Sequence, residues 1–355
     1  MQITKDDIRS AVAAGVISES QAASTIALAE ARAGRRRAIR RNDEPFEFFR
    51  GFAEIFVSIG LVLLISGILA FTSVFGGFLT PALAAFLCWT FARYFTIKRR
   101  MSLPSIVLVT GFALGSAAAI ALALTRIVPY WQNDPLYTAG YFVLIILALA
   151  FWYRSYRVPF TMFLGGLAVM GLIFVLTGSL NPAQSGAANW SSMFDLRDGS
   201  GLALGTLIFG IIAFAAGLYF DMRDPYRIGR WSACGFWLHI LAAPAIVNTV
   251  ALSAYTSGDV VGKILLAVVL AIVAVLALII DRRSFLTAGI VYLGILVAWV
   301  VRFGDEAQSF ALVMVILGAI LTAMGSFWSQ LRSILLQALP EFPGKSRLPP
   351  YVLTR

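Results

Sequence analysis

Ten apolar segments alternate with short polar loops along most of the chain. They lie approximately at residues 52–74, 78–96, 103–124, 136–153, 158–180, 201–220, 231–254, 260–280, 285–302 and 309–328. A bilayer core of ~30 Å needs ~20 helical residues, so each segment is long enough to cross it. Backbone groups in lipid must be satisfied internally, and the apolar residues do not alternate as barrel strands would. The pattern therefore predicts an all-α, polytopic transmembrane bundle of about ten helices.

The composition agrees with a chain whose main solvent is lipid. Of the 355 residues, 59% are hydrophobic and 13% are charged. A soluble domain carries roughly 25% charged residues. The lipid bilayer is therefore the first partner that the sequence predicts.

The basic residues fall on alternate loops. Together with Arg93 at a helix end, 24 of the 28 Lys and Arg residues lie in the N-terminal region, the C-terminal tail and the loops near residues 98–100, 154–157, 223–230 and 282–283. The other side holds Arg126, Arg197, Lys263 and Arg302. Positive charge marks cytoplasmic loops, so both ends of the chain are predicted to be cytoplasmic. The net charge of +10 is then a topology signal and does not indicate nucleic-acid binding.

Residues 1–50 form the first predicted domain, a small cytoplasmic hairpin followed by an Arg-rich linker. Within residues 1–33, Thr4 and Ser18 begin N-terminal capping patterns, and Gly15 ends the first helix. So few residues cannot hold a strong core alone. The hairpin is expected either to lie near the bilayer or to dock on a protein partner.

The linker carries five clustered arginines just before the first span. Such a cluster attracts anionic lipid headgroups, at ~1 kcal/mol per side chain. The predicted headgroup-binding residues are Arg35, Arg36, Arg37, Arg40 and Arg41.

The transmembrane domain covers residues 51–328, and residues 329–355 form a third part. Leu331, Ile334, Leu335 and Ala338 recur at helical spacing, which predicts a short interfacial helix ended by Pro340. The cytoplasmic tail from residue 345 onward is expected to be extended or disordered.

His239 is the candidate that carries chemistry, because it is the single histidine and is predicted to be the one ionisable side chain well inside a span. Pro244 follows it and cannot donate to the carbonyl of Ile240. On a helical wheel, the face of His239 also holds Ser232, Gly235, Phe236, Ala242, Ala243 and Ile246, four of which are small. This face is expected to pack on other helices.

Two interpretations of His239 remain open. An intramembrane ionisable group is a functional candidate, and imidazole titrates in the physiological range. The alternative is a neutral histidine that makes one interhelical hydrogen bond, because no Asp, Glu or Lys is expected deep in another span. Asn248 lies on roughly the opposite face of the same helix, and Glu54 lies one turn inside the first span, where it could pair with Arg93 or anchor at the interface.

Small residues at every fourth position mark a packing face on the third segment. They are Gly111, Gly115, Ala119 and Ala123. Such stripes let two helices approach closely. Packing within one chain is favoured over a dimer face.

Patterns typical of enzymes are missing from the sequence. It contains no paired carboxylates within a span, no His-Glu-x-x-His motif and no Gly-rich phosphate cradle. The two cysteines, Cys88 and Cys234, have no Cys or His at metal-binding spacing. The sequence therefore predicts a protein that is not an enzyme and that holds no cofactor or metal.

Three stretches resemble a family of uncharacterised bacterial membrane proteins with a short N-terminal hairpin and many spans. They are residues 15–22 (GVISESQA), 50–57 (RGFAEIFV) and 237–244 (WLHILAAP). The resemblance implies a multi-pass protein of the bacterial inner membrane, and it implies no activity. The excess of Arg over Lys is consistent with a bacterial source.

Two functional classes follow from these observations. One is a small-solute transporter or channel, favoured by the span count, Pro244 and His239. The other is a non-transporting membrane scaffold or assembly factor that recruits partners through residues 1–33.

Overall fold

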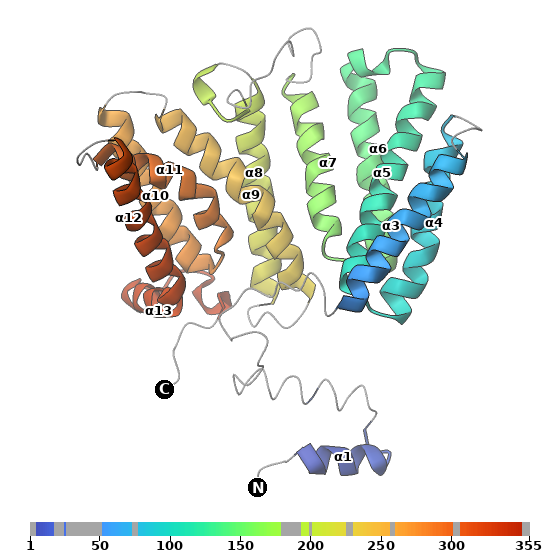
Figure 1. The fold of residues 1–355 in the computed structure, drawn as a ribbon, viewed down its shortest axis with the longest axis horizontal. Coiled ribbons are helices and arrows are strands. Elements are labelled where there is room, and N and C mark those ends of the chain that lie inside the picture. The colour runs from blue at the N-terminus through green and yellow to red at the C-terminus, as the bar shows by residue number, and fades with distance from the viewer. Residues whose placement is uncertain are drawn as a thin grey trace. The chain divides into compact units, whose positions relative to one another are not determined.

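The computed structural model describes residues 5–17, 25, 52–72, 77–178, 193–198, 201–224, 230–255, 260–300 and 306–349. Within these ranges the chain forms helices and no strand, which confirms the all-α class (Figure 1). The chain divides into two compact units, residues 1–45 and residues 46–355.

The first unit contains the helix α1, Lys5–Ala13. Gly15 follows with a φ of +70°, a left-handed conformation that glycine adopts readily and that ends the helix where the sequence predicts. Apart from Thr25, the second predicted helix and the five clustered arginines lie outside the described residues.

In the second unit, each of the ten apolar segments contains one long helix. These helices are α3 Phe52–Thr72, α4 Leu79–Ala92, α5 Ser102–Ile127, α6 Pro135–Tyr156, α7 Thr161–Leu176, α8 Gly201–Arg223, α9 Arg230–Tyr255, α10 Val260–Ile280, α11 Ser284–Val300 and α12 Glu306–Ser326. A π-helical segment, Arg93–Lys98, continues α4, and the helix α13, Trp328–Ala338, follows α12. Short 3₁₀ turns cover Trp131–Asn133, Leu196–Asp198 and Lys345–Arg347.

Seven of these helices are long and apolar enough to cross a membrane: α3, α5, α6, α8, α9, α10 and residues 308–326 of α12. The apolar helices α7 and α11 are shorter. Many large apolar side chains face outward, such as Phe52 (78% exposed) and Val261 (70% exposed). Water would disfavour so much exposed apolar surface, whereas lipid matches it, so the unit has the character of a membrane helix bundle.

The two glycines of the predicted small stripe on α5 pack against α4. A Cβ atom added to Gly115 would lie 2.8 Å from the Pro81 carbonyl oxygen and 2.9 Å from the Ala85 nitrogen. A Cβ atom on Gly111 would lie 2.6 Å from the Cys88 sulfur. The two glycines therefore let neighbouring helices of one chain approach closely, which is the expected intramolecular packing.

The helix α9 is the most enclosed of the membrane-length helices. It packs against α7, α8, α10 and α11. In its most apolar stretch 61% of the residues are buried, against 39% or less in the other six. Any polar group carried by the middle of α9 is consequently held away from both lipid and water.

Up to residue 349, where the described residues end, the C-terminal segment has more regular structure than the sequence suggests. A helix is present where one is predicted, and it ends before Pro340. Lys345–Arg347 form a 3₁₀ turn and not the extended chain that we expected. The reason is that Lys345 is buried and its Nζ donates to the Leu339 carbonyl at 2.8 Å and to Glu341 at 3.2 Å. A lone lysine in a polar tail gives no sequence signal of such a contact.

Candidate functional site

His239 lies in the first half of the enclosed helix α9, nine residues after Arg230. The side chain is 0% exposed, and the small residues of its face, including Ser232, Ala242 and Ala243, are fully buried as well. The predicted packing of this face on other helices is therefore confirmed. Pro244 lies inside α9 one turn further on.

Two charged residues join His239, and this corrects the expectation that it stands alone. Nε2 of His239 lies 3.0 Å from Oδ2 of Asp221, in the last turn of α8. Arg282, in the turn between α10 and α11, donates from Nε to Oδ2 of Asp221 at 3.0 Å and from Nη2 to Oδ1. We call Asp221, His239 and Arg282 the buried triad; their exposed fractions are 6%, 0% and 0%.

The hydrogen-bond pattern of the buried triad assigns a hydrogen to Nε2 of His239. A carboxylate that receives a two-pronged guanidinium contact is ionised and only accepts hydrogen bonds. Nε2 of His239 must then carry the hydrogen that it shares with Asp221. With a neutral imidazole, the charges of Asp221 and Arg282 cancel within the cluster, which is the condition for burying a pair of charges.

The first turn of α9 completes the surroundings of Arg282. Its Nη2 donates to the carbonyl of Ser232 at 3.0 Å and lies 3.5 Å from the Ser232 hydroxyl. The ring of Phe236 lies 6.0 Å from the guanidinium carbon. The rings of Phe214 and Phe285 meet the imidazole edge-on, with centroids 5.7 and 5.8 Å away. The cluster is thus walled by aromatic side chains, which lower the local dielectric and strengthen its charge contacts.

Two glycines create the space that the triad occupies. A Cβ atom on Gly217 would lie 2.9 Å from the imidazole of His239. A Cβ atom on Gly235 would overlap the carboxylate of Asp221. Glycine at these two helical positions lets α8 and α9 approach closely with the polar groups between them.

The sequence-based prediction did not include Asp221 or Arg282, because each lies just beyond the end of an apolar segment. The predicted sixth segment stops at residue 220, and Arg282 was assigned to a loop that sets topology. The sequence does contain one signal, which is an acidic residue close to the basic residues that follow the sixth segment. A basic loop that only sets topology needs no acidic residue, so Asp221 could have been predicted to form an ion pair.

The other predicted site residues lie apart from the triad. Asn248 is nine residues after His239, or about 13 Å along the axis of α9. Its carbonyl lies 3.5 Å from the Tyr292 hydroxyl, which belongs to α11. Pro244 sits between the two positions on the same helix.

Glu54 has a different role from the pairing or anchoring that was expected. It is 6% exposed, and its Oε2 accepts the backbone N–H groups of Ser102 and Leu103, both at 3.1 Å. These N–H groups belong to the first turn of α5, where the helix dipole favours an anion. Arg93 instead lies over the Trp89 ring, 5.5 Å from its centroid. Glu54 therefore fixes the start of α5 against α3.

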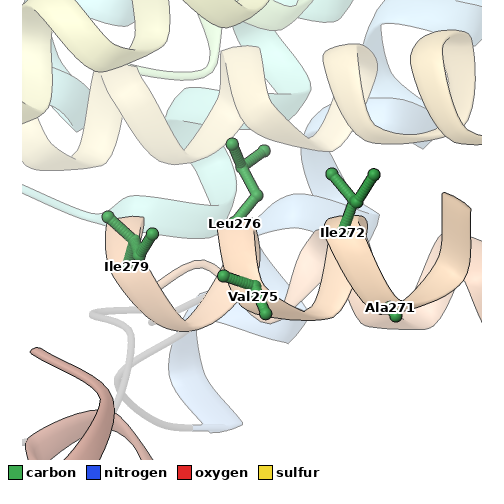
Figure 2. A pocket seen from close by; sticks show the side chains of 5 residues that line it. All are labelled: Ala271, Ile272, Val275, Leu276 and Ile279. Atoms are coloured by element: carbon green, nitrogen blue, oxygen red, sulfur yellow. The ribbon is translucent and has the colours of Figure 1, made fainter. Parts of the chain in front are cut away.

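A shallow apolar depression lies on the surface of α10. It is lined by Ala271, Ile272, Val275, Leu276 and Ile279 (Figure 2). No polar atom lines it, so it offers no chemistry beyond apolar contact. Among the described residues, no group of three or more His, Cys, Asp or Glu side chains could hold a metal ion.

Fold and site together define a membrane-type helix bundle with an ionic triad in its interior. No family model, no curated protein and no solved structure matches the chain. The resemblance to the bacterial membrane family described above consequently stays a prediction.

Proposed function

We propose that the chain is a ten-span protein of the bacterial inner membrane with both ends in the cytoplasm. The ten helices of the second unit support the span count. Every second helix of this series has a basic residue in its last turn or shortly after its end: Lys98 and Arg282 follow α4 and α10, and Arg154 and Arg223 lie in the last turns of α6 and α8. These residues lie on one side of the bundle if every helix crosses.

We further propose that the protein is a small-solute transporter whose cycle is linked to a proton on the buried triad. The observation that carries this proposal is the buried contact of Asp221 in α8 with His239 in α9 and with Arg282 in the α10–α11 turn. Ionisable groups in membrane interiors are costly and mark ion, proton or substrate pathways. A histidine without charged partners could have a packing role alone. A histidine that shares a carboxylate with an arginine is different, because its protonation changes the balance of a buried ion pair.

The geometry supports a simple switch. Proton uptake by His239 at Nδ1 would change the net charge of the triad from zero to +1. The charged groups that face the imidazole are Asp221 from α8 and Arg282 from the α10–α11 turn, beside the rings of Phe214 and Phe285. A charged imidazole competes with Arg282 for the same carboxylate. Loss of the contact between Arg282 and Asp221 would free the α10–α11 turn from α8, while the hydrogen bond from Arg282 to the Ser232 carbonyl would keep the turn on α9. Such a shift of α8 is a change of helix packing of the kind that alternating access requires.

The test is whether water reaches the triad during the cycle. A His239→Cys variant, in a background where Cys88 and Cys234 are replaced by Ala, is exposed to a charged thiol reagent from each side of the membrane. Labelling from at least one side is expected, since a transported proton needs an aqueous path. A Phe214→Cys variant repeats the measurement without altering the triad, in case the first variant does not fold.

Native Cys88 provides the matched control. It is 0% exposed and packs in the hydrophobic core formed by α3 to α7. A chain that keeps Cys88 as its single cysteine should therefore not react with the reagent. Absence of labelling at both positions 239 and 214, from both sides, would refute transport through this region.

A scaffold is the second candidate function, and one observation favours it. Residues 1–45 form a compact unit separate from residues 46–355. Val16, just after α1, is 75% exposed, as expected of a surface that meets a partner. A photo-crosslinking residue at Val16 in the full chain should give one discrete adduct if the unit recruits a protein. A lack of any adduct in growing cells would count against the scaffold.

A further inference from the structure

The turn between α10 and α11 joins the buried triad to the C-terminal helix α13. Three consecutive residues form this turn, and Arg282 in the middle points to Asp221. Asp281, before it, accepts a hydrogen bond from Nε1 of Trp328 at 2.6 Å. Arg283, after it, lies over the Trp328 ring at 5.5 Å from the centroid. Asp281 has a φ of +58°, a left-handed conformation that reverses the chain here.

A second contact fixes α13 to the end of α10, just before this turn. Arg332 is 4% exposed, and its Nε donates to the Leu278 carbonyl in the last turn of α10 at 3.0 Å. Its Nη2 donates to the Pro349 carbonyl at 2.8 Å. The last carbonyls of a helix lack partners within it, so Arg332 satisfies one of them and draws the tail onto α13. The helix is therefore held at two points one turn apart.

The remaining surface of α13 has two sides of opposite character. The buried face holds Trp328, Arg332, Ser333 and Leu336. At 100° per residue, the exposed polar residues Gln330 and Gln337 lie side by side. The next sector is exposed and apolar, and it holds Phe327 (56%), Leu331 (39%), Ile334 (66%) and Ala338. A buried face, an exposed polar face and an exposed apolar face thus follow one another around the helix. This arrangement is typical of a helix at a membrane interface.

We propose that α13 lies in the bilayer interface on lipid through its apolar sector, and that it is coupled to the buried triad through residues 281–283. Displacement of α13 from the interface then pulls on Asp281 and Arg283 and changes the contact between Arg282 and Asp221. The occupant of the apolar sector is the lipid surface, because α13 directly follows the membrane-length helix α12 and presents glutamines beside the sector. The proposal rests on the membrane embedding given under Proposed function, and it does not require that a solute is transported.

The position of α13 is tested with single spin labels in vesicles of phosphatidylcholine and phosphatidylglycerol. Labels at Leu331 and Ile334 should relax with oxygen, which concentrates in lipid. Labels at Gln330 and Gln337 should relax with a water-soluble nickel chelate. If all four labels respond to the nickel chelate, α13 lies in water and the proposal is wrong.

The coupling is tested with the ring nitrogens of His239, which is the single histidine and therefore the source of one imidazole signal in ¹⁵N-labelled protein purified without a histidine tag. Ile334→Asp places a charge in the apolar sector and should move the His239 resonance. Gln330→Asp is the matched control, because it adds the same charge to the polar side of the helix. An unchanged resonance in the first variant, or equal shifts in both, would overturn the coupling.

A second pair of variants tests the link at Trp328 directly. Trp328→Phe removes the hydrogen bond to Asp281 and should shift the His239 resonance. Trp131→Phe is the control, because it removes a part-buried indole hydrogen bond elsewhere in the bundle, from Nε1 to the Thr125 hydroxyl at 3.1 Å, and it should leave the His239 resonance unshifted. Equal responses in the two variants would contradict the proposed route. A lack of thiol labelling at both positions 239 and 214 would refute transport without affecting these resonances, so the two proposals fail separately.

Discussion

Nε2 of His239 lies 3.0 Å from Oδ2 of Asp221, although the two residues are 18 positions apart and belong to different helices. Arg282, which is 61 positions from Asp221, holds the same carboxylate. Three elements of the bundle thus meet at one ionised group. Because that group is buried, each partner matters for stability as well as for any proton-linked step.

The charge balance of the triad predicts a strong effect of Asp221→Asn. The change leaves the guanidinium of Arg282 buried without its counter-ion, which costs about 3–5 kcal/mol of folding free energy. Reversible unfolding in mixed detergent micelles measures the loss. The double variant Asp221→Asn with Arg282→Gln removes both charges and should be less destabilised than Asp221→Asn alone. If the double variant is the less stable of the two, charge compensation does not hold the triad.

The close approach of α8 and α9 predicts that Gly217→Ala destabilises the fold. The new methyl group would overlap the imidazole of His239, and overpacking of this kind costs typically about 1–3 kcal/mol. Gly165→Ala in α7 is the matched control, because nothing lies within 4 Å of its added Cβ atom. Thermal unfolding of both variants in the same detergent should separate them. Equal melting temperatures would mean that α8 and α9 are not so close.

The carboxylate of Glu54 predicts a graded response at the start of α5. Glu54→Gln keeps an acceptor but loses the charge that favours the helix N-terminus, so a loss of about 0.5–1 kcal/mol is expected. Glu54→Ala removes both and should cost about 1–2 kcal/mol. Amide hydrogen exchange at Ser102 and Leu103 reports the change locally. A Gln variant as stable as wild type would show that the charge contributes nothing.

The buried Lys345 predicts that the tail is held by one side chain. Lys345→Met removes the hydrogen bonds to the Leu339 carbonyl and to Glu341, and hydrogen bonds of charged groups are worth about 1.5–3 kcal/mol. Backbone exchange within residues 345–349 should then become at least roughly tenfold faster. Arg347→Met is the control, because the Arg347 side chain is exposed. Its backbone N–H donates to the Gly344 carbonyl, and the substitution leaves this bond in place. Equal rates in the two variants would show that another contact holds the tail.

The sequence predicts the helices well and their polar contacts poorly, and the physical reason is the range of each interaction. Apolar runs are local, so the ten segments and the burial of the His239 face follow from nearby residues. The contacts of Asp221 with Arg282 and of Trp328 with Asp281 join positions that only the fold brings together. The local sequence around Arg282 also does not reveal its role. An arginine that sets topology and an arginine that pairs with a buried carboxylate look alike in a short basic loop.

The separation of Asp221 and Arg282 along the chain has a consequence for biogenesis. A ribosome adds roughly 5–20 residues per second, so Arg282 emerges roughly 3–12 s after Asp221. During that interval, the α8–α9 hairpin carries a carboxylate that has His239 but not yet its arginine, and a charged group in lipid is costly. The hairpin is therefore best retained beside the insertion machinery until the next hairpin is made. With the proposed membrane embedding, the charge balance of the triad is complete only once Arg282 has been made.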